Sequence, residues 1–334
     1  MGPSLQAKPR VLYICGWGRS GSTLVDRVLG EAPGFVSVGE LRSLWDTDPA
    51  VQLCGCGAPI ADCRLWGPIL HAMSSAGGYT VDSVRELRDA TSRSRHLVRL
   101  WRAAKGGRRA SLSAAVRYGD VLTGIYAAVR MATGSAIVVD SSKHPAEALV
   151  LAARPDVDLT VLHLVRDPRG SAYSWSRRRR RAAEDMEARH TPEPPRRGLF
   201  SSSAWWTTWN AVAESMIRPV LGSRYLSLRY EDVMDSPRDQ LGAVVQRLGV
   251  SAGDLPFVGT NEVVLGAAHT VAGNPNRMER GVVRLEADTE WRRELRGADR
   301  WKATLPALPM LRHFGYGVRG TRQQPPRRLG SFRV

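Results

Sequence analysis

The stretch Val11-Leu-Tyr-Ile-Cys-Gly-Trp-Gly-Arg-Ser-Gly-Ser-Thr-Leu24 decides the fold of this chain. Its first five residues form a short apolar run, which is typical of a buried strand. The run stops at a glycine-rich turn that extends from Gly16 to Gly21. Apolar residues then recur with helical spacing up to Leu29, so a helix is predicted from Ser22. The free N–H groups and the dipole of a helix N-terminus attract anions, so this stretch predicts a phosphate site.

The spacing of the turn matches the P-loop pattern G-x-x-x-x-G-K-[ST] with one departure. Gly16, Gly21 and Thr23 are in place, but Ser22 stands where the lysine belongs. That lysine contacts the β- and γ-phosphates of a nucleoside triphosphate. Its absence disfavours ATP and GTP and indicates another anionic nucleotide. The alternative is a tight strand–helix connection that binds nothing.

Composition limits the function classes without choosing among them. The chain has 334 residues and a formal charge of +16, and only four of its 48 basic residues are lysines. A large positive charge fits an anionic ligand, a nucleic acid or an acidic membrane surface. The chain contains no apolar run of 18 residues and no signal-peptide pattern, so we expect a soluble, cytoplasmic protein without a transmembrane segment.

Four further strands are expected along the chain, and helical patterns alternate with them. This alternation predicts an α/β protein, a P-loop-like three-layer fold whose mostly parallel sheet carries helices on both faces. No repeat or internal boundary is visible, so one domain is expected over residues 1–320. The remaining predictions are strands at 35–38, 136–139, 159–165 and 224–229, a helical insertion at about 65–135, a mobile basic loop at about 180–200 and a disordered tail at 321–334.

Three cysteines cluster in a turn-rich segment at Cys54, Cys56 and Cys63. Packed, reduced thiols are the expectation. A zinc site is one alternative, with His71 as the nearby candidate for a fourth ligand, although the first pair is C-x-C rather than C-x₂₋₄-C. A disulfide is the other alternative, and a reducing cytoplasm disfavours it.

In their order and spacing, six segments make the chain resemble the sulfotransferases that use 3′-phosphoadenosine 5′-phosphosulfate (PAPS). The catalytic set resembles most the tyrosylprotein, Golgi-type branch, and the chain is expected to be a bacterial member. The resemblance extends from about residue 11 to about residue 300. The segments are Gly18–Thr23, Val38–Leu41, Asp140–Pro145, Val165–Ser174, Leu228–Asp232 and Gly273–Arg277.

The resemblance implies which residues bind the nucleotide. The first loop would hold the 5′-phosphosulfate, and Arg166 with Ser174 would hold the 3′-phosphate. Each nucleotide contact has a structural alternative. Arg166 could instead pair with a carboxylate while Ser174 faces solvent, and Tyr230 could simply pack at a strand end. Residues 273–277 could form a plain turn. The full implied set is Arg19, Ser20, Gly21, Ser22, Thr23, Arg166, Ser174, Arg178, Tyr230, Asn274 and Arg277.

The resemblance also implies catalytic roles. Glu40 would be the general base, Lys143 would stabilise the bridging oxygen of the leaving phosphate, and Arg19 would contact the sulfuryl oxygens. His144 is a rival base, but it precedes Pro145 and could simply cap a helix. No metal is expected in this chemistry, because there is no triphosphate to bridge.

The expected function is transfer of a sulfuryl group from PAPS to an acceptor hydroxyl, with adenosine 3′,5′-bisphosphate (PAP) as the product. A P-loop nucleotide kinase and a basic nucleic-acid-binding protein are the alternatives, although no specific nucleic-acid motif is present. The acceptor remains open among small molecules, glycans, lipids and a peptide tyrosine, and so does the oligomeric state. Trp205, Trp206 and Trp209 are expected to pack in the core, or else to stack on an acceptor.

Overall fold

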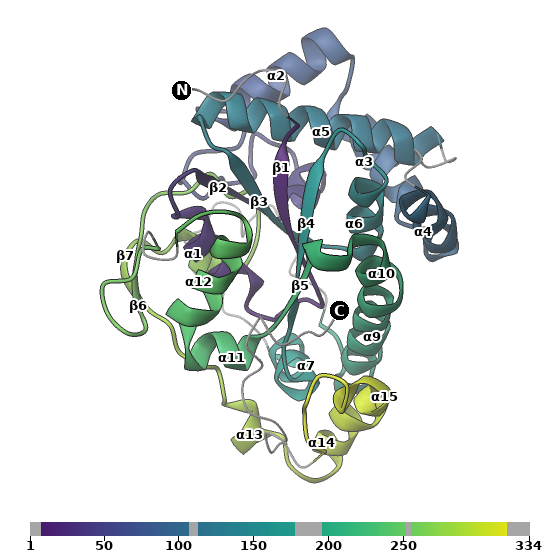
Figure 1. The fold of residues 1–334 in the computed structure, drawn as a ribbon, viewed down its shortest axis with the longest axis vertical. Helices are drawn as coiled ribbons and strands as arrows, with labels where there is room; N and C mark the ends of the chain where they lie inside the picture. Colours follow the sequence, from purple (N-terminus) through teal and green to yellow (C-terminus); the bar gives the residue numbers. More distant parts are fainter. Residues whose placement is uncertain (1–7, 107–112, 178–195, 252–254, 319–334) are drawn as a thin grey trace.

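A five-stranded parallel sheet organises the computed structural model, which describes residues 8–106, 113–177, 196–251 and 255–318 (Figure 1). Its strand order is β2-β3-β1-β4-β5, so the first strand lies in the centre. This arrangement confirms the predicted α/β fold with a parallel sheet. The strands are β1 Arg10–Cys15, β2 Phe35–Gly39, β3 Ile137–Lys143, β4 Asp158–Val165 and β5 Tyr225–Arg229.

Helices cover both faces of the sheet because successive strand residues point to opposite sides. In β1, Val11, Tyr13 and Cys15 join one buried cluster, whereas Leu12 and Ile14 join the other. One face packs against α1 Ser22–Gly30, α11 Tyr230–Asp235 and α12 Pro237–Arg247. The other face packs against α5 Ser113–Thr133, α6 Pro145–Ala152 and α10 Arg218–Leu221 (Figure 1).

The segment between β2 and β3 carries most of the additional helices. It holds the short helix η1 Leu41–Trp45, then α2 Trp66–Gly77, α3 Val81–Thr91, η2 Ser94–His96, α4 Leu97–Lys105 and α5. The helices from α2 to α5 correspond in position to the predicted insertion. Arg178, most of the predicted basic loop and the predicted tail lie outside the described residues.

The remaining elements lie outside the central sheet. A two-stranded antiparallel sheet, which the sequence analysis did not predict, pairs β6 Glu262–Leu265 with β7 Gly281–Arg284. The others are α7 Pro168–Ser176, α9 Leu199–Val212, η3 Ala213–Ile217, η4 Gly222–Arg224, η6 Pro275–Met278, α13 Trp291–Glu294, α14 Gly297–Thr304, η7 Leu305–Ala307 and α15 Leu308–Leu311. Within the described ranges, no helix is both long and apolar enough to cross a membrane.

Candidate active site

The predicted phosphate loop connects β1 to α1 and is closed on one side by an aromatic ring. Gly21 has a left-handed backbone, with φ of 82°, at the N-terminus of α1. A Cβ on this residue would lie 2.5 Å from Cδ2 of Tyr230, so the ring leaves no room for a side chain. The carbonyl of Gly21 accepts hydrogen bonds from the N–H groups of Leu24 and Val25, which starts the helix. The first N–H groups of α1 have no intrahelical partner and are available to an anion.

Arg19 projects from this loop in an unusual backbone conformation. Its φ is 68°, and among the described residues Lys143, with φ of 70°, is the other non-glycine residue with a positive φ. Such conformations are costly and concentrate at functional sites. The Arg19 guanidinium donates to Oδ1 of Asn274 and lies 5.0 Å from the centre of the Trp175 ring. The Asn274 N–H donates to Oγ1 of Thr23 at 3.3 Å. The segment Gly273–Arg277, called the late loop from here on, therefore lies against the phosphate loop.

Glu40 and Lys143, which the sequence places far apart, form an ion pair between Lys143 Nζ and Glu40 Oε1. Glu40 follows β2, and Lys143 ends β3, the adjacent strand. The register explains how Lys143 is aimed. Tyr13 pairs with Asp140, whereas Cys15 pairs with Lys143, so β3 holds one more residue than β1 over this interval. A bulge of this kind redirects side chains at the end of a strand.

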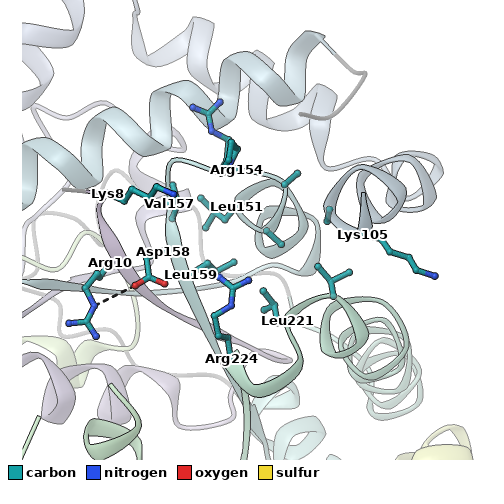
Figure 2. A pocket seen from close by; sticks show the side chains of 15 residues that line it. Lys8, Arg10, Lys105, Leu151, Arg154, Val157, Asp158, Leu159, Leu221 and Arg224 are labelled. Atoms are coloured by element: carbon teal, nitrogen blue, oxygen red, sulfur yellow. Dashed lines mark ion pairs between the residues drawn. The ribbon is translucent and has the colours of Figure 1, made fainter. Parts of the chain in front are cut away.

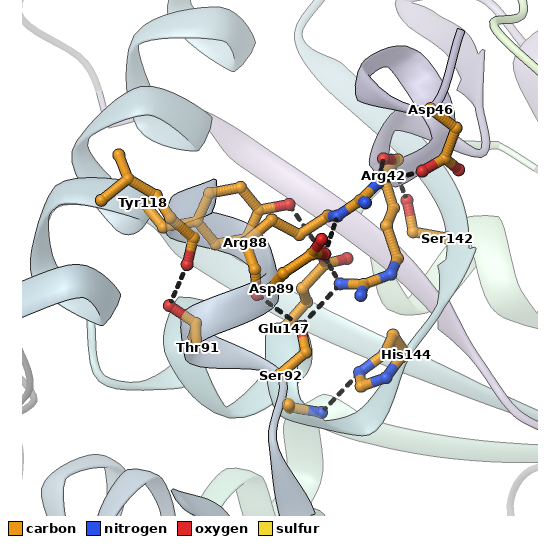
Figure 3. A network of polar contacts seen from close by, with 12 residues as sticks. Arg42, Asp46, Arg88, Asp89, Thr91, Ser92, Tyr118, Ser142, His144 and Glu147 are labelled. Carbon is orange, nitrogen blue, oxygen red and sulfur yellow. Dashed lines mark hydrogen bonds and ion pairs between the residues drawn. The ribbon is translucent and has the colours of Figure 1, made fainter. Parts of the chain in front are cut away.

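A buried polar network includes residues close in sequence to this pair and was missed by the sequence analysis (Figure 3). Glu147 of α6 accepts from Arg42 at 2.6 Å and from the Tyr118 hydroxyl at 2.5 Å. The Arg42 N–H donates to Oγ of Ser142 at 2.9 Å. Arg42 follows Glu40 closely, and Ser142 precedes Lys143. The network therefore fixes the backbone positions of the two candidate catalytic residues relative to each other.

His144 is occupied as a helix cap. Its Nδ1 accepts the Ala146 N–H at 3.3 Å, and Pro145 takes the first position of α6. Burial, together with the Arg42 guanidinium, lowers the pKa of His144 to about 4. Both features weaken the rival interpretation of His144 as the base. The lowered pKa makes the imidazole a weaker base, and the lone pair on Nδ1 is already used by the cap.

Arg166 lies beside the loop at the end of β4 and is 5% exposed. Its guanidinium lies 4.6 Å from the centre of the Tyr230 ring, and its Nη1 donates to the Arg19 carbonyl at 3.1 Å. Its Nη2 lies 3.0 Å from Oδ2 of Asp288, so the carboxylate pairing considered as the alternative does occur. Asp288 has a side chain that is 40% exposed.

Two buried polar atoms near the start of α7 lack hydrogen-bond partners within the described residues. They are Nε of Arg166 and Oγ of Ser171. Ser174, one helical turn after Ser171, is also buried. Buried polar atoms are usually satisfied, and an anion bound here could accept from such donors. The predicted helix continues to residue 181, but α7 ends at Ser176.

Tyr230 and Arg277, both predicted near the nucleotide, are placed differently. The Tyr230 hydroxyl accepts the Asp288 N–H at 3.0 Å, and its ring lies between Gly21 and Arg166. Arg277 is buried, and its Nη2 donates to the Leu53 carbonyl at 3.0 Å. Arg277 therefore joins its loop to the cysteine segment, which favours a structural role over the predicted contact with nucleotide.

The three clustered tryptophans do not share one environment. Trp206 is fully buried, and its indole N–H donates to the Arg166 carbonyl. Trp205 is 43% exposed, and with Trp209 it packs against Trp17 of the phosphate loop. Trp209 also contacts the His144 ring edge to face, with ring centres 5.2 Å apart. Expected core packing thus applies to Trp206, whereas the other two form an aromatic wall beside the candidate catalytic groups.

A separate basic pocket lies at the opposite ends of the strands. Its volume is about 600 Å³, and Arg10, Asp158 and Arg224 line it together with Lys8 and Lys105 (Figure 2). Arg10 and Asp158 begin β1 and β4 and form an ion pair of 3.6 Å. Ligands of open α/β sheets bind at the carboxyl ends of the strands, so this pocket is not the candidate active site.

Comparison with known proteins identifies the family of the chain. A model described as the sulfotransferase family matches residues 10–254. No curated protein sequence matches the chain. Among solved structures, the sulfotransferase domain of the Synechococcus PCC 7002 olefin synthase is 19% identical, with a TM-score of 0.49, over 95% of this chain and 98% of that one. The sulfotransferase domain from the curacin biosynthetic pathway is 16% identical, with a TM-score of 0.47, over 93% and 99%.

Proposed function

Because the chain belongs to the sulfotransferase family, we propose that it transfers the sulfuryl group of PAPS to an acceptor hydroxyl and releases PAP. The observation that carries this proposal is the contact between Glu40 and Lys143 at the end of adjacent strands. The phosphate loop follows β1, the next strand of the sheet. This member of the family therefore has a phosphate loop, a cation and a carboxylate together at the carboxyl ends of its strands.

The chemistry assigns one role to each group. Sulfuryl transfer resembles phosphoryl transfer in that a group moves in line between two oxygens, so positioning and positive charge supply most of the catalysis. Arg19 would neutralise the sulfuryl oxygens, and Lys143 would neutralise the bridging oxygen as its bond to sulfur breaks. Glu40 would take the proton of the acceptor hydroxyl as that oxygen bonds to sulfur.

Nucleotide binding requires Arg166 to exchange one anion for another. In the free protein, Arg166 pairs with the half-exposed Asp288. We expect a 3′-phosphate to displace that carboxylate, which can turn toward solvent. The phosphate would also offer acceptors to the buried Nε of Arg166 and to Oγ of Ser171.

The acceptor side is the less specific part of the proposal. Trp205 and Trp209 offer an apolar, aromatic wall, and Trp209 contacts His144, the residue after Lys143; such a wall suits a small-molecule, glycan or lipid hydroxyl. Binding of a specific nucleic acid is not proposed. A cytoplasmic location stays a prediction of the sequence.

A matched pair of variants tests nucleotide binding. Calorimetric titration with PAP should show binding to the wild type, at least tenfold weaker binding to Arg166→Ala, and equal or tighter binding to Asp288→Ala, which removes the competing carboxylate. Equal losses in both variants would mean that the Arg166–Asp288 pair is only structural. Binding of ATP with magnesium in place of PAP would favour the kinase, and binding of DNA alone would favour the nucleic-acid-binding protein.

Turnover tests the catalytic pair. Release of PAP from PAPS in the presence of pooled hydroxyl acceptors should fall by about 10²–10⁴ in Glu40→Gln, while PAP affinity stays unchanged. The same rate in Glu40→Gln as in the wild type would remove Glu40 as the base.

A further inference from the structure

We propose that Cys54, Cys56, Cys63 and His269 form a structural zinc site. The four ligand atoms lie within 4.8 Å of one another, although His269 comes about two hundred residues after the cysteines. This departs from the expectation of reduced, packed thiols. It also replaces His71, the fourth ligand considered from the sequence, which lies on α2 and contacts Ser75 instead.

Four of the separations between ligand atoms are close to the edges of a zinc tetrahedron, and all of them lie within 4.8 Å. With Zn–S bonds of about 2.3 Å and a Zn–N bond of about 2.0 Å, two sulfurs lie about 3.8 Å apart, and a sulfur and a nitrogen about 3.5 Å apart. Here Sγ of Cys63 lies 3.5 Å from that of Cys54 and 3.9 Å from that of Cys56. Nδ1 of His269 lies 3.2 Å from Sγ of Cys63 and 3.8 Å from that of Cys54.

Backbone contacts orient the ligands from both segments. The Gly55 N–H donates to the Thr270 carbonyl at 2.8 Å, and the Trp66 indole N–H donates to the His269 carbonyl at 2.7 Å. A tight turn, closed by the Gly57 N–H on the Cys54 carbonyl, brings Cys54 and Cys56 to one side. Ligand positions set by surrounding hydrogen bonds are typical of metal sites.

Two arginines lie near this site. Three thiolates around a divalent ion carry a net charge of −1. Arg280 donates to the Cys56 carbonyl at 2.9 Å, and Nε of Arg64 lies 3.5 Å from Nε2 of His269. With zinc on Nδ1, Nε2 carries the proton and cannot accept from Arg64, so the exposed Arg64 side chain would move away from it.

Because the protein supplies all four ligands, no position remains for substrate, and the site is structural rather than catalytic. Zinc would join the segment after η1 to the segment that leads into Asn274. Asn274 contacts Arg19 and Thr23, so the metal would hold the late loop against the phosphate loop. The zinc site itself does not depend on the proposed function, and its test uses no nucleotide.

The test measures zinc in the full-length chain, purified under reducing conditions. Elemental analysis should give about one zinc per chain for the wild type and little for His269→Gln and Cys56→Ser. His71→Gln and Cys15→Ala are matched controls, because they remove a histidine and a cysteine outside the cluster, and both should retain the metal. Full zinc retention by His269→Gln would overturn the ligand set.

A second measurement does not depend on the folding of any variant. Wild-type protein freed of zinc by a chelator and then given cobalt(II) should show the intense visible absorption of a tetrahedral site and a sulfur-to-cobalt charge-transfer band. Zinc should displace both signals, and the chelator should lower the thermal midpoint of the wild type. No metal uptake by the reduced protein, or a Cys54–Cys63 disulfide that persists instead of metal binding, would overturn the proposal.

Discussion

Gly21→Ala tests whether the phosphate loop depends on close contact with an aromatic ring. The substitution adds one methyl group where φ is 82° and where a Cβ would lie 2.5 Å and 2.7 Å from two atoms of the Tyr230 ring. The backbone conformation alone costs about 1–2 kcal/mol for a residue with a Cβ. Crowding in a packed region adds about 1–3 kcal/mol. The expected loss in the free energy of unfolding is therefore about 2–5 kcal/mol.

Gly134→Ala is the matched control, because Gly134 has φ of 69° and no atom within 4 Å of an added Cβ. It should lose only the backbone contribution of about 1–2 kcal/mol. Urea denaturation of both variants measures the difference, and Tyr230→Ala in the Gly21→Ala background should recover the crowding contribution. Equal losses in the two glycine variants, or no coupling between Gly21 and Tyr230, would refute the reasoning. Displacement of Tyr230 should also disturb Arg166, so PAP affinity should fall in Gly21→Ala alone.

Three further predictions follow from buried groups. Burial raises the pKa of Asp26 to about 8, above its value of about 4 in the unfolded chain, so the folded state holds an extra proton between these values. Through this group, the free energy of unfolding should therefore fall by about 1.4 kcal/mol per pH unit from about pH 4 to about pH 8. Urea denaturation of Asp26→Asn across this range should lack that contribution. Identical pH profiles for Asp26→Asn and the wild type would contradict the prediction. An asparagine can also cap a helix, so His144→Asn should keep the stability and the PAP release of the wild type, whereas His144→Ala should lose about 1 kcal/mol of stability. A loss of turnover of 10²-fold or more in His144→Asn would instead indicate that His144 is the general base. Glu147→Gln leaves Arg42 without its buried carboxylate and should cost about 3–5 kcal/mol in thermal or urea unfolding, and a change below 1 kcal/mol would mean that the network of Figure 3 contributes little.

Local sequence patterns were sufficient to predict the parallel sheet, whereas the candidate catalytic residues were identified only through the family resemblance. The five strands coincide with apolar runs that end in turns, and parallel strands bring their carboxyl ends to the same side of the sheet. Glu40 and Lys143 follow neighbouring strands, so their contact is a consequence of strand order. The antiparallel pair of β6 and β7 was not predicted, because each strand has four residues and a long connection separates the two.

Partners contributed by distant loops could not be predicted. His269 meets Cys63 across 206 positions, and Asp288 meets Arg166 across 122. Neither contact produces a periodic pattern of residues in the sequence, because tertiary packing determines the conformation of these loops. Trp205 and Trp206 show the same limit within one helix, since helical spacing indicates a face but not what covers it.

The strand order separates two groups of residues along the sheet. Arg166 and Tyr230 follow β4 and β5 on one side of β1, whereas Glu40 follows β2 and Lys143 ends β3 on the other. β2 is an edge strand with one neighbouring strand, and on its outer side the Val38 carbonyl accepts the Val271 N–H at 2.9 Å, so local opening of β2 requires this contact to break as well. Under the proposed function, opening of β2 would separate Glu40 from Lys143 while Arg166 and Tyr230 stay in place, so we expect such a chain to bind the donor without consuming it.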